Sequence, residues 1–303
     1  MNFSAPPPER RPQTVSGQQC SISIIGGMKT KNKKMRFMKI GFFQYDVIWR
    51  NRDANLSYIS SKIKNSVFDL LVLPELFTSG YAFNSKEELI PFAENLNDSY
   101  TVDYLTQLMK KCGGYITGTI PELYENKLYN TSILVGTEGL VASYRKIHLP
   151  NYEKRAFTEG SKAVSCNCNN AKIGLTICFD SWFAPLSSKL RLQGAEIICH
   201  SACFGGEVTP KIIPIRALEN QCFFISCNRV GTEMFDGEPD SYCGKSQIVN
   251  PDGKILIKAD NEEVLSIIDI ELSEVNNPNF GSLILNDFIS EHKKYDIKVK
   301  ANT

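Results

Sequence analysis

From residue 38 onward, short apolar runs alternate with segments whose apolar residues recur every three or four positions. The run 68–73 is apolar throughout, which is typical of a strand that is covered on both faces. Residues 55–66, in contrast, place their apolar side chains on one face of a helix. Hairpins are expected at 128–144 and around the Pro-Asp-Gly turn of 246–257. We therefore predict an α/β sandwich that is built on mixed sheets.

Of the 303 residues, the core of about 265 that begins at residue 38 fits one large α/β domain or two small ones. No internal repeat is visible in the sequence. The remaining expected strands are 39–45, 115–120, 172–178, 196–200, 222–228 and 264–270, and the remaining expected helices are 100–111, 184–193 and 210–221.

The charge balance indicates which partners to expect. The net charge of +1 gives no electrostatic basis for binding nucleic acid or an anionic membrane. No apolar run reaches the roughly 18 residues that a transmembrane helix needs. We therefore predict a small-molecule substrate as the partner, with no nucleic acid and no membrane.

Ten cysteines are many for this length, and most lie in or beside apolar runs. They do not form the dense framework of a short secreted protein, so free thiols in a reducing, cytoplasmic setting are expected. Cys166 and Cys168, or Cys199, His200 and Cys203, leave a metal site open as an alternative. With three histidines and no pair of Cys-x-x-Cys units, the expectation is that no metal or other cofactor is needed.

Residues 1–37 differ in composition from the rest of the chain. They are rich in proline and basic residues and contain one acidic residue, Glu9, which predicts a disordered basic arm. An organellar targeting segment is an alternative. So is an over-long start, since Met28, Met35 and Met38 each offer a later one. The expected domain spans 38–285, followed by a C-terminal tail at 286–303.

Three apolar runs each end on a reactive side chain, namely Glu75, Lys146 and Cys178. Any one of them alone has an ordinary structural explanation; a cysteine after a strand is usually a buried small hydrophobe. Together they form a set suited to attack on a carbon–nitrogen bond. Glutamate takes a proton, cysteine attacks, and lysine stabilises the oxyanion.

The motifs around these residues resemble the nitrilase superfamily of carbon–nitrogen hydrolases, whose catalytic triad is Glu, Lys and Cys in that order. The matching segments are Leu73-Pro74-Glu75 with Gly80-Tyr81, Tyr144-Arg145-Lys146 with His148-Leu149-Pro150, and Gly174 to Asp180. The resemblance covers roughly residues 38 to 285. It implies a four-layer αββα sandwich with two face-to-face mixed β-sheets. It also implies homodimers through the helical layer, often extended to larger homo-oligomers.

The resemblance further assigns roles near the triad. The backbone N–H of Phe179 is expected to share the oxyanion with Lys146. Glu122, at the end of Thr-Gly-Thr-Ile-Pro-Glu, is expected to position the substrate or the lysine. We interpret Asp180 as ordering the turn after the nucleophile, and His148 as structural rather than as the partner of a Cys-His dyad.

The expected pocket-lining residues are Tyr81, Phe179, Trp182 and Phe204. The substrate cues conflict. Trp182 stands where many relatives have arginine, which resembles the subset that cleaves N-carbamoyl amines. The segment Phe77-Thr-Ser-Gly-Tyr81-Ala-Phe resembles simple amidases such as ω-amidase.

More distant segments receive weaker expectations. A substrate carboxylate would have to be recognised by another segment, with Arg229 or Lys211 as candidates. The run that contains Arg216, Glu219 and Asn228 resembles scaffold or dimer-contact residues of the family.

The predicted function is a cysteine-dependent hydrolase of a small amide or N-carbamoyl (ureido) compound that acts through a thioester. A true nitrilase is an alternative, although Phe179 stands where nitrilases usually carry tryptophan. Two further alternatives are acyl transfer to an amine and a non-catalytic binding protein on the same fold.

Overall fold

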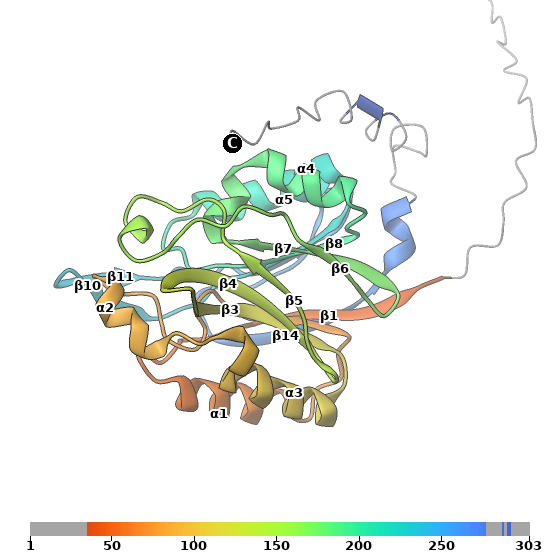
Figure 1. Cartoon of the computed structure of the whole chain (residues 1–303). Helices are drawn as coiled ribbons and strands as arrows, with labels where there is room; N and C mark the ends of the chain where they lie inside the picture. The colour runs from red at the N-terminus through yellow and green to blue at the C-terminus, as the bar shows by residue number, and fades with distance from the viewer. Residues whose placement is uncertain (1–34, 277–286, 288–289, 292–303) are drawn as a thin grey trace, which may run out of the picture. The chain divides into compact units, whose positions relative to one another are not determined.

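The computed structural model describes residues 35–276, 287 and 290–291. Two six-stranded mixed sheets lie face to face, and helices cover both outer faces (Figure 1). The expected four-layer αββα sandwich is therefore confirmed. The helices are α1 (Arg52–Ile63), α2 (Lys86–Leu89), α3 (Tyr100–Cys112), α4 (Ala184–Leu192) and α5 (Val208–Asn220). Among the described residues, no helix has both the length and the apolar character that crossing a membrane requires.

The first sheet has the order β14-β1-β2-β3-β4-β5, with β1, β2 and β3 parallel and the other pairs antiparallel. Its strands are β1 (Phe37–Gln44), β2 (Leu70–Val72), β3 (Tyr115–Tyr124), β4 (Lys127–Gly136), β5 (Gly139–Arg145) and β14 (Val264–Glu271).

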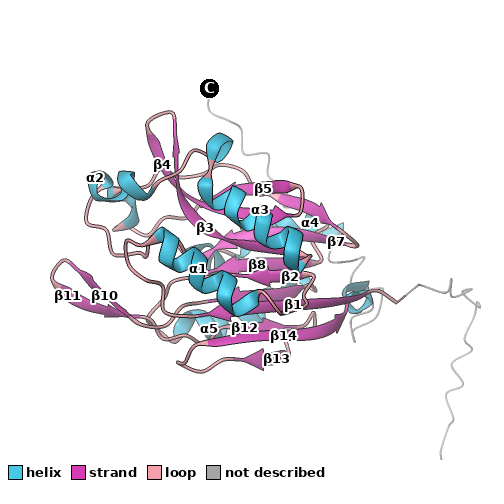
Figure 2. Cartoon of the chain, turned by 90° about the horizontal axis from the view of Figure 1, so that it is seen from below, coloured by secondary structure: helices cyan, strands magenta, loops and turns pink. Residues whose placement is uncertain are grey.

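The second sheet has the order β13-β12-β9-β8-β7-β6, with β7, β8 and β9 parallel. Its strands are β6 (Ser165–Cys168), β7 (Ala171–Ile177), β8 (Ile197–Ser201), β9 (Phe223–Cys227), β12 (Gln247–Val249) and β13 (Ile255–Lys258). Outside both sheets, β10 (Thr232–Phe235) and β11 (Glu238–Ser241) form a hairpin that extends past the sheet edges (Figure 2).

Strand periodicity explains why both faces of each sheet are apolar. In β2 the side chains of Leu70 and Val72 point into the core between the sheets, whereas Leu71 packs under the outer helices. Helices α1 and α3 cover that outer face, and α4 and α5 cover the second sheet. The helix starts are set locally, since Asn51 accepts from Ala54 N at 3.1 Å and Ser99 accepts from Val102 N at 3.1 Å.

The expected helices and strands are present, but their bounds shift by up to four residues; the helix expected at 55–66, for example, is α1 at Arg52–Ile63. The hairpin β10–β11, the edge strand β6 and the short helix α2 were not expected. Their segments contain polar, proline and cysteine residues instead of alternating apolar ones, so periodicity gives no signal there.

The start of the domain needs a correction. Strand β1 begins at Phe37, and Arg36 lies against the second sheet, where its Nη2 contacts Glu196 Oε1 at 2.5 Å and its Nη1 donates to Asn170 O at 2.5 Å. The domain therefore includes residues 35–37, which composition had assigned to the arm. Residues 1–34, and all but three of residues 277–303, lie outside the described residues, so the arm and the tail stay predictions.

We expect Arg36→Ala to lower the free energy of unfolding by about 1–2 kcal/mol, the scale of charge-assisted hydrogen bonds. The ion pair is mostly buried, with side-chain exposures of 29% for Arg36 and 15% for Glu196. Urea unfolding measures the change. Lys39→Ala is the matched control, because its pair with Asp269 is exposed at 44% and 67% and should contribute under about 0.5 kcal/mol. Equal losses in the two variants would contradict the anchoring role of Arg36.

Candidate active site

The three reactive residues that end apolar runs meet at one end of the sandwich. Glu75 follows β2, Lys146 follows β5, and Cys178 follows β7 of the second sheet. The backbone N–H of Glu75 donates to Ala202 O at 3.1 Å, just past β8, so this contact joins the two sheets at the site. The sandwich therefore brings together groups that lie about one hundred residues apart in the chain.

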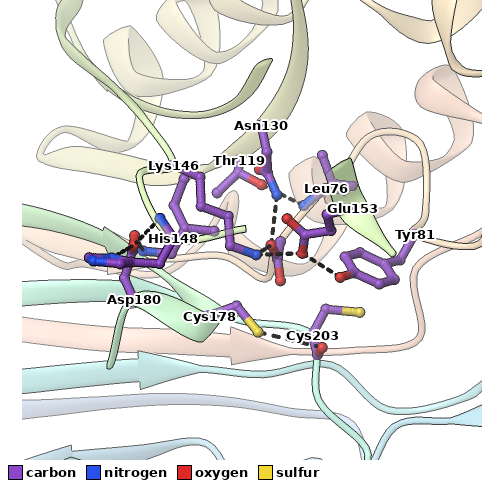
Figure 3. A network of polar contacts seen from close by, with 12 residues as sticks. Leu76, Tyr81, Thr119, Asn130, Lys146, His148, Glu153, Cys178, Asp180 and Cys203 are labelled. Carbon is purple, nitrogen blue, oxygen red and sulfur yellow. Dashed lines mark hydrogen bonds and ion pairs between the residues drawn. The ribbon is translucent and has the colours of Figure 1, made fainter. Parts of the chain in front are cut away.

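A buried ion-pair network surrounds the lysine. Lys146 Nζ lies 2.8 Å from Glu75 Oε1 and 2.5 Å from Glu153 Oε1, and none of the Lys146 or Glu75 side chain is exposed. Asn130 Nδ2 donates to the same Glu75 oxygen at 2.7 Å, and the Tyr81 hydroxyl donates to Glu153. Figure 3 shows the lysine directed between Asn130 and Glu153, with Tyr81 beyond Glu153.

Burial controls the ionisation of this network. Burial raises the pKa of Glu75 to about 7, against the opposing attraction of Lys146. Burial disfavours the Lys146 ammonium, but the carboxylates of Glu153 and Glu75 outweigh it and raise the pKa of Lys146 well above its ordinary value. Lys146 is thus a fixed cation, while Glu75 can gain or lose a proton near neutral pH.

Cys178 lies at the turn between β7 and the short 3-10 helix η4 (Cys178–Trp182). Its φ of +41° is strained for a residue with a side chain, a feature that clusters at functional turns. Burial raises the pKa of the Cys178 thiol well above its ordinary value, and the nearby Glu75 carboxylate adds to that effect. The resting cysteine is therefore a neutral thiol that needs a base at the moment of attack.

The free acceptor on Glu75 is suited to that task. Its second oxygen, Oε2, is buried and has no hydrogen-bond partner within the described part of the chain. Cys178 Sγ lies 3.6 Å from Cys203 O, and Figure 3 shows the two cysteines side by side next to the lysine network. A thiol, an unpaired carboxylate oxygen and a fixed ammonium can together perform nucleophilic attack, proton transfer and oxyanion stabilisation.

Two histidines and an aspartate hold the turn at the nucleophile. Asp180 accepts from Tyr144 Oη at 2.7 Å and from Ile177 N at 2.9 Å, and its other oxygen lies 2.8 Å from His148 Nδ1. His200 Nε2 lies 2.8 Å from Cys178 O and can only donate to that carbonyl. Burial lowers the pKa of His200 to about 4, so its ring is neutral at neutral pH. The aspartate therefore orders the turn, as expected.

His148 has the structural position that the sequence indicated. Its ring stacks on Phe183 with centroids 4.0 Å apart, and within the described part of the chain its backbone N–H and its ring nitrogen both contact Asp180. These contacts account for the position of His148 without a Cys-His dyad.

The placement expected for Glu122 is corrected by the structure. Its carboxylate accepts from Thr131 Oγ1 at 2.7 Å and from Arg145 Nε and Nη2 at 2.8 and 2.6 Å. Those contacts tie β3 to β4 and β5, and Glu122 does not line the cavity described below. Glu153 holds the lysine instead. A carboxylate seven residues after Lys146 is the only sequence sign of it, and that sign is not specific.

A cavity of about 520 Å³ opens over Cys178. All four residues expected to line the pocket do so; they are Tyr81, Phe179, Trp182 and Phe204. Sequence reasoning missed Tyr152 and the residues that come from or follow the hairpin β10–β11, which are Phe235, Asp240 and Tyr242. Their contribution to substrate binding stays a prediction.

Arg229 does not serve the expected role. Its side chain is fully buried, donates to Glu233 and to Val47 O at 2.9 Å, and lies 3.1 Å from Asp46. Glu233 in turn accepts from the backbone N–H groups of Tyr81 and Ala82 at 2.8 and 2.7 Å. The arginine therefore supports the cavity wall from behind, where a substrate carboxylate cannot reach it.

The other candidate residues fall into two groups. Lys211 is exposed on α5 and does not line the cavity. Arg216 donates to Ser181 O at 2.7 Å and pairs with Glu219, and Asn228 bonds both the N–H and the carbonyl of Phe204. Arg216 therefore supports the turn after Cys178, and Asn228 supports the cavity wall at Phe204.

Comparisons with known proteins give consistent matches. Residues 39–277 match the model of the carbon-nitrogen hydrolase family. The chain is 33% identical over 263 residues to a nitrilase of Pyrococcus abyssi, covering 85% of this chain and 98% of the relative. It is 30% identical over 236 residues to an (R)-stereoselective amidase of Pseudomonas, covering 74% and 83%. A carbon-nitrogen hydrolase structure from Helicobacter pylori superposes with a TM-score of 0.77 at 21% identity, covering 87% of this chain and 98% of that one.

Proposed function

The chain belongs to the carbon–nitrogen hydrolase family and is a hydrolase of carbon–nitrogen bonds, and we propose that it cleaves a small amide or ureido compound through a thioester on Cys178. The observation that carries the proposal is the buried pair of Glu75 and Lys146, 2.8 Å apart, beside a thiol that opens into a cavity. Lys146 is the only buried lysine among the described residues.

The first half of the proposed reaction forms the thioester. Cys178 Sγ attacks the substrate carbonyl carbon while its proton passes to Glu75, whose pKa near 7 suits that transfer at neutral pH. The oxyanion is stabilised by the ammonium of Lys146 and by the N–H of Phe179, which lies in the first turn of η4, where helix N–H groups lack a partner in the helix. The carbon–nitrogen bond then breaks, and Glu75 returns the proton to the leaving amine.

The second half releases the product. Water attacks the thioester carbonyl and gives a proton to Glu75, and the same two donors stabilise the second oxyanion. When the carbon–sulfur bond breaks, the proton on Glu75 returns to the sulfur of Cys178. Glu153 takes no proton in this scheme; its contact with Lys146 Nζ at 2.5 Å keeps the ammonium in place.

An amide or ureido group is favoured over a nitrile by the residues after the nucleophile. Phe179 stands where nitrilases usually carry tryptophan, and Trp182 gives the cavity an apolar wall where many relatives have arginine. The guanidinium of Arg216 lies nearby but donates to the carbonyls of Ser181 and Trp182, at 2.7 and 3.3 Å. A nitrile is the second candidate substrate, because the relative from Pyrococcus abyssi carries the name nitrilase. Transfer of the acyl group to an amine instead of water would use the same thioester.

The proposal is tested with hexanamide, pentylurea and hexanenitrile, which share one five-carbon tail. We expect ammonia release from the amide or the urea with a kcat/KM at least about tenfold above that of the nitrile. Rapid acid quenching followed by intact-protein mass spectrometry should show an acyl adduct that is absent from Cys178→Ala. A nitrile with the highest kcat/KM would establish the second candidate, and turnover without any adduct would contradict the thioester.

A further inference from the structure

We infer that the cavity accepts amides whose far end is positively charged, and that Asp240 is the carboxylate that recognises this charge. The inference rests on the proposed function, because the amide end must reach Cys178. It concerns the other end of the substrate, which faces residues from the hairpin β10–β11.

Only one of the residues that line the cavity is of an acidic or basic type. No lysine, arginine or histidine lines it among the described residues, and Asp240 is its only carboxylate. The two cations behind the wall are already neutralised. Lys146 contacts Glu75 and Glu153, and Arg229 contacts Glu233 and Asp46. A ligand anion would therefore find no free cation here, whereas a ligand cation would find a free anion.

Asp240 is available to a ligand. It lies in β11, is exposed to solvent, and has no ion pair or side-chain hydrogen bond to the described part of the chain. The residue paired with it across the hairpin is Glu233 on β10. The carboxylate of Glu233 is paired with Arg229. Asp240 is therefore the acidic group that remains open to the cavity.

Aromatic rings supply the second, independent observation. Phe235 from the same hairpin packs edge-on against Tyr152, with ring centroids 6.3 Å apart, and both rings line the cavity. Tyr242, which follows β11, already has the Arg229 guanidinium over its ring, 4.4 Å from the centroid. The faces of such rings attract ammonium and guanidinium groups as well as alkyl chains. A carboxylate beside aromatic walls is the combination expected for an amide that ends in an alkyl ammonium group.

The same features disfavour substrates that end in a carboxylate. Such a group would lie against Asp240 and the aromatic walls without a compensating cation, and desolvating an unpaired charge is costly. The charge of this cavity separates the expected substrate of this chain from an amide of a dicarboxylic acid.

The inference is tested with three amides of matched length, which are 5-aminopentanamide, hexanamide and adipamic acid. We expect the ammonium compound to exceed hexanamide in kcat/KM by about tenfold, the scale of one charge-assisted hydrogen bond, and adipamic acid to be the poorest. Asp240→Asn should bring the ammonium-to-neutral ratio close to one, and Asp240→Lys should make adipamic acid the best of the three. Glu238→Gln removes the same charge from an exposed position of β11 outside the lining, and should keep the wild-type ratio.

A binding measurement separates this inference from the proposed function. Calorimetry with Cys178→Ala should show tighter binding of 5-aminopentanamide than of adipamic acid, and Asp240→Asn in that background should remove the difference. If amides are cleaved without a charge preference, or if Asp240→Asn leaves the ratio unchanged, Asp240 is not the recognition group and the proposed function stands. If no amide is cleaved but binding depends on Asp240, the recognition stands and the proposed reaction fails.

Discussion

Replacing Cys178 with alanine should abolish turnover of the preferred substrate while the free energy of unfolding stays nearly constant. The thiol is the only group of the cavity that is placed both beside the Glu75–Lys146 pair and at a strained turn, with φ of +41°. Alanine keeps the Cβ atom and therefore the backbone geometry, but no nucleophile remains to form the thioester. Ammonia release and urea unfolding measure the two effects.

Cys203→Ala is the matched control for that variant. Cys203 lines the same cavity and is a free thiol like Cys178, and its contact with Cys178 Sγ is made by its backbone carbonyl at 3.6 Å, which alanine retains. We expect Cys203→Ala to keep the greater part of the activity. An active Cys178→Ala together with an inactive Cys203→Ala would move the nucleophile to Cys203.

Glu75→Gln should lower kcat by about 10²–10⁴-fold, the range for loss of a general base. Glutamine keeps the size of the side chain and an oxygen that can accept from Lys146, but it cannot carry the thiol proton. The matched control is Glu122→Gln on β3, whose carboxylate is bound by Thr131 and Arg145 away from the cavity, and which should change kcat by less than a few-fold. A larger loss in Glu122→Gln than in Glu75→Gln would overturn this assignment of the base.

The pH profile gives a second measure of the same role. The pKa of Glu75 is raised to about 7, so Glu75 is a carboxylate above that pH and a neutral acid below it. Because only the carboxylate accepts the thiol proton, kcat/KM should fall as the pH falls through about 7. That limb should disappear from the residual activity of Glu75→Gln. A profile that is flat between pH 5 and pH 8 in the wild type would contradict Glu75 as the base.

The sequence was sufficient to identify the three candidate catalytic residues that the structure brings together, and their catalytic roles stay predictions. Glu75, Lys146 and Cys178 each follow an apolar run, and runs of that kind form buried strands because of local pattern and burial. The family motifs around them supplied the order of the layers, which periodicity alone does not specify. The four pocket residues were found because they lie within a few positions of those motifs or of a strand end.

The tertiary structure decided which charges are paired and which are free. Glu122 ends a family-like motif and Glu153 has no motif of its own, yet Glu122 binds Arg145, and Glu153 reaches Lys146. Arg229 was a candidate for binding a substrate, and the fold buries it against Glu233. Asp240 has no neighbouring motif and becomes part of the cavity through the hairpin. The physical reason is that pairing and desolvation depend on contacts between segments far apart in the chain, whereas strand and helix patterns depend on neighbours in the sequence.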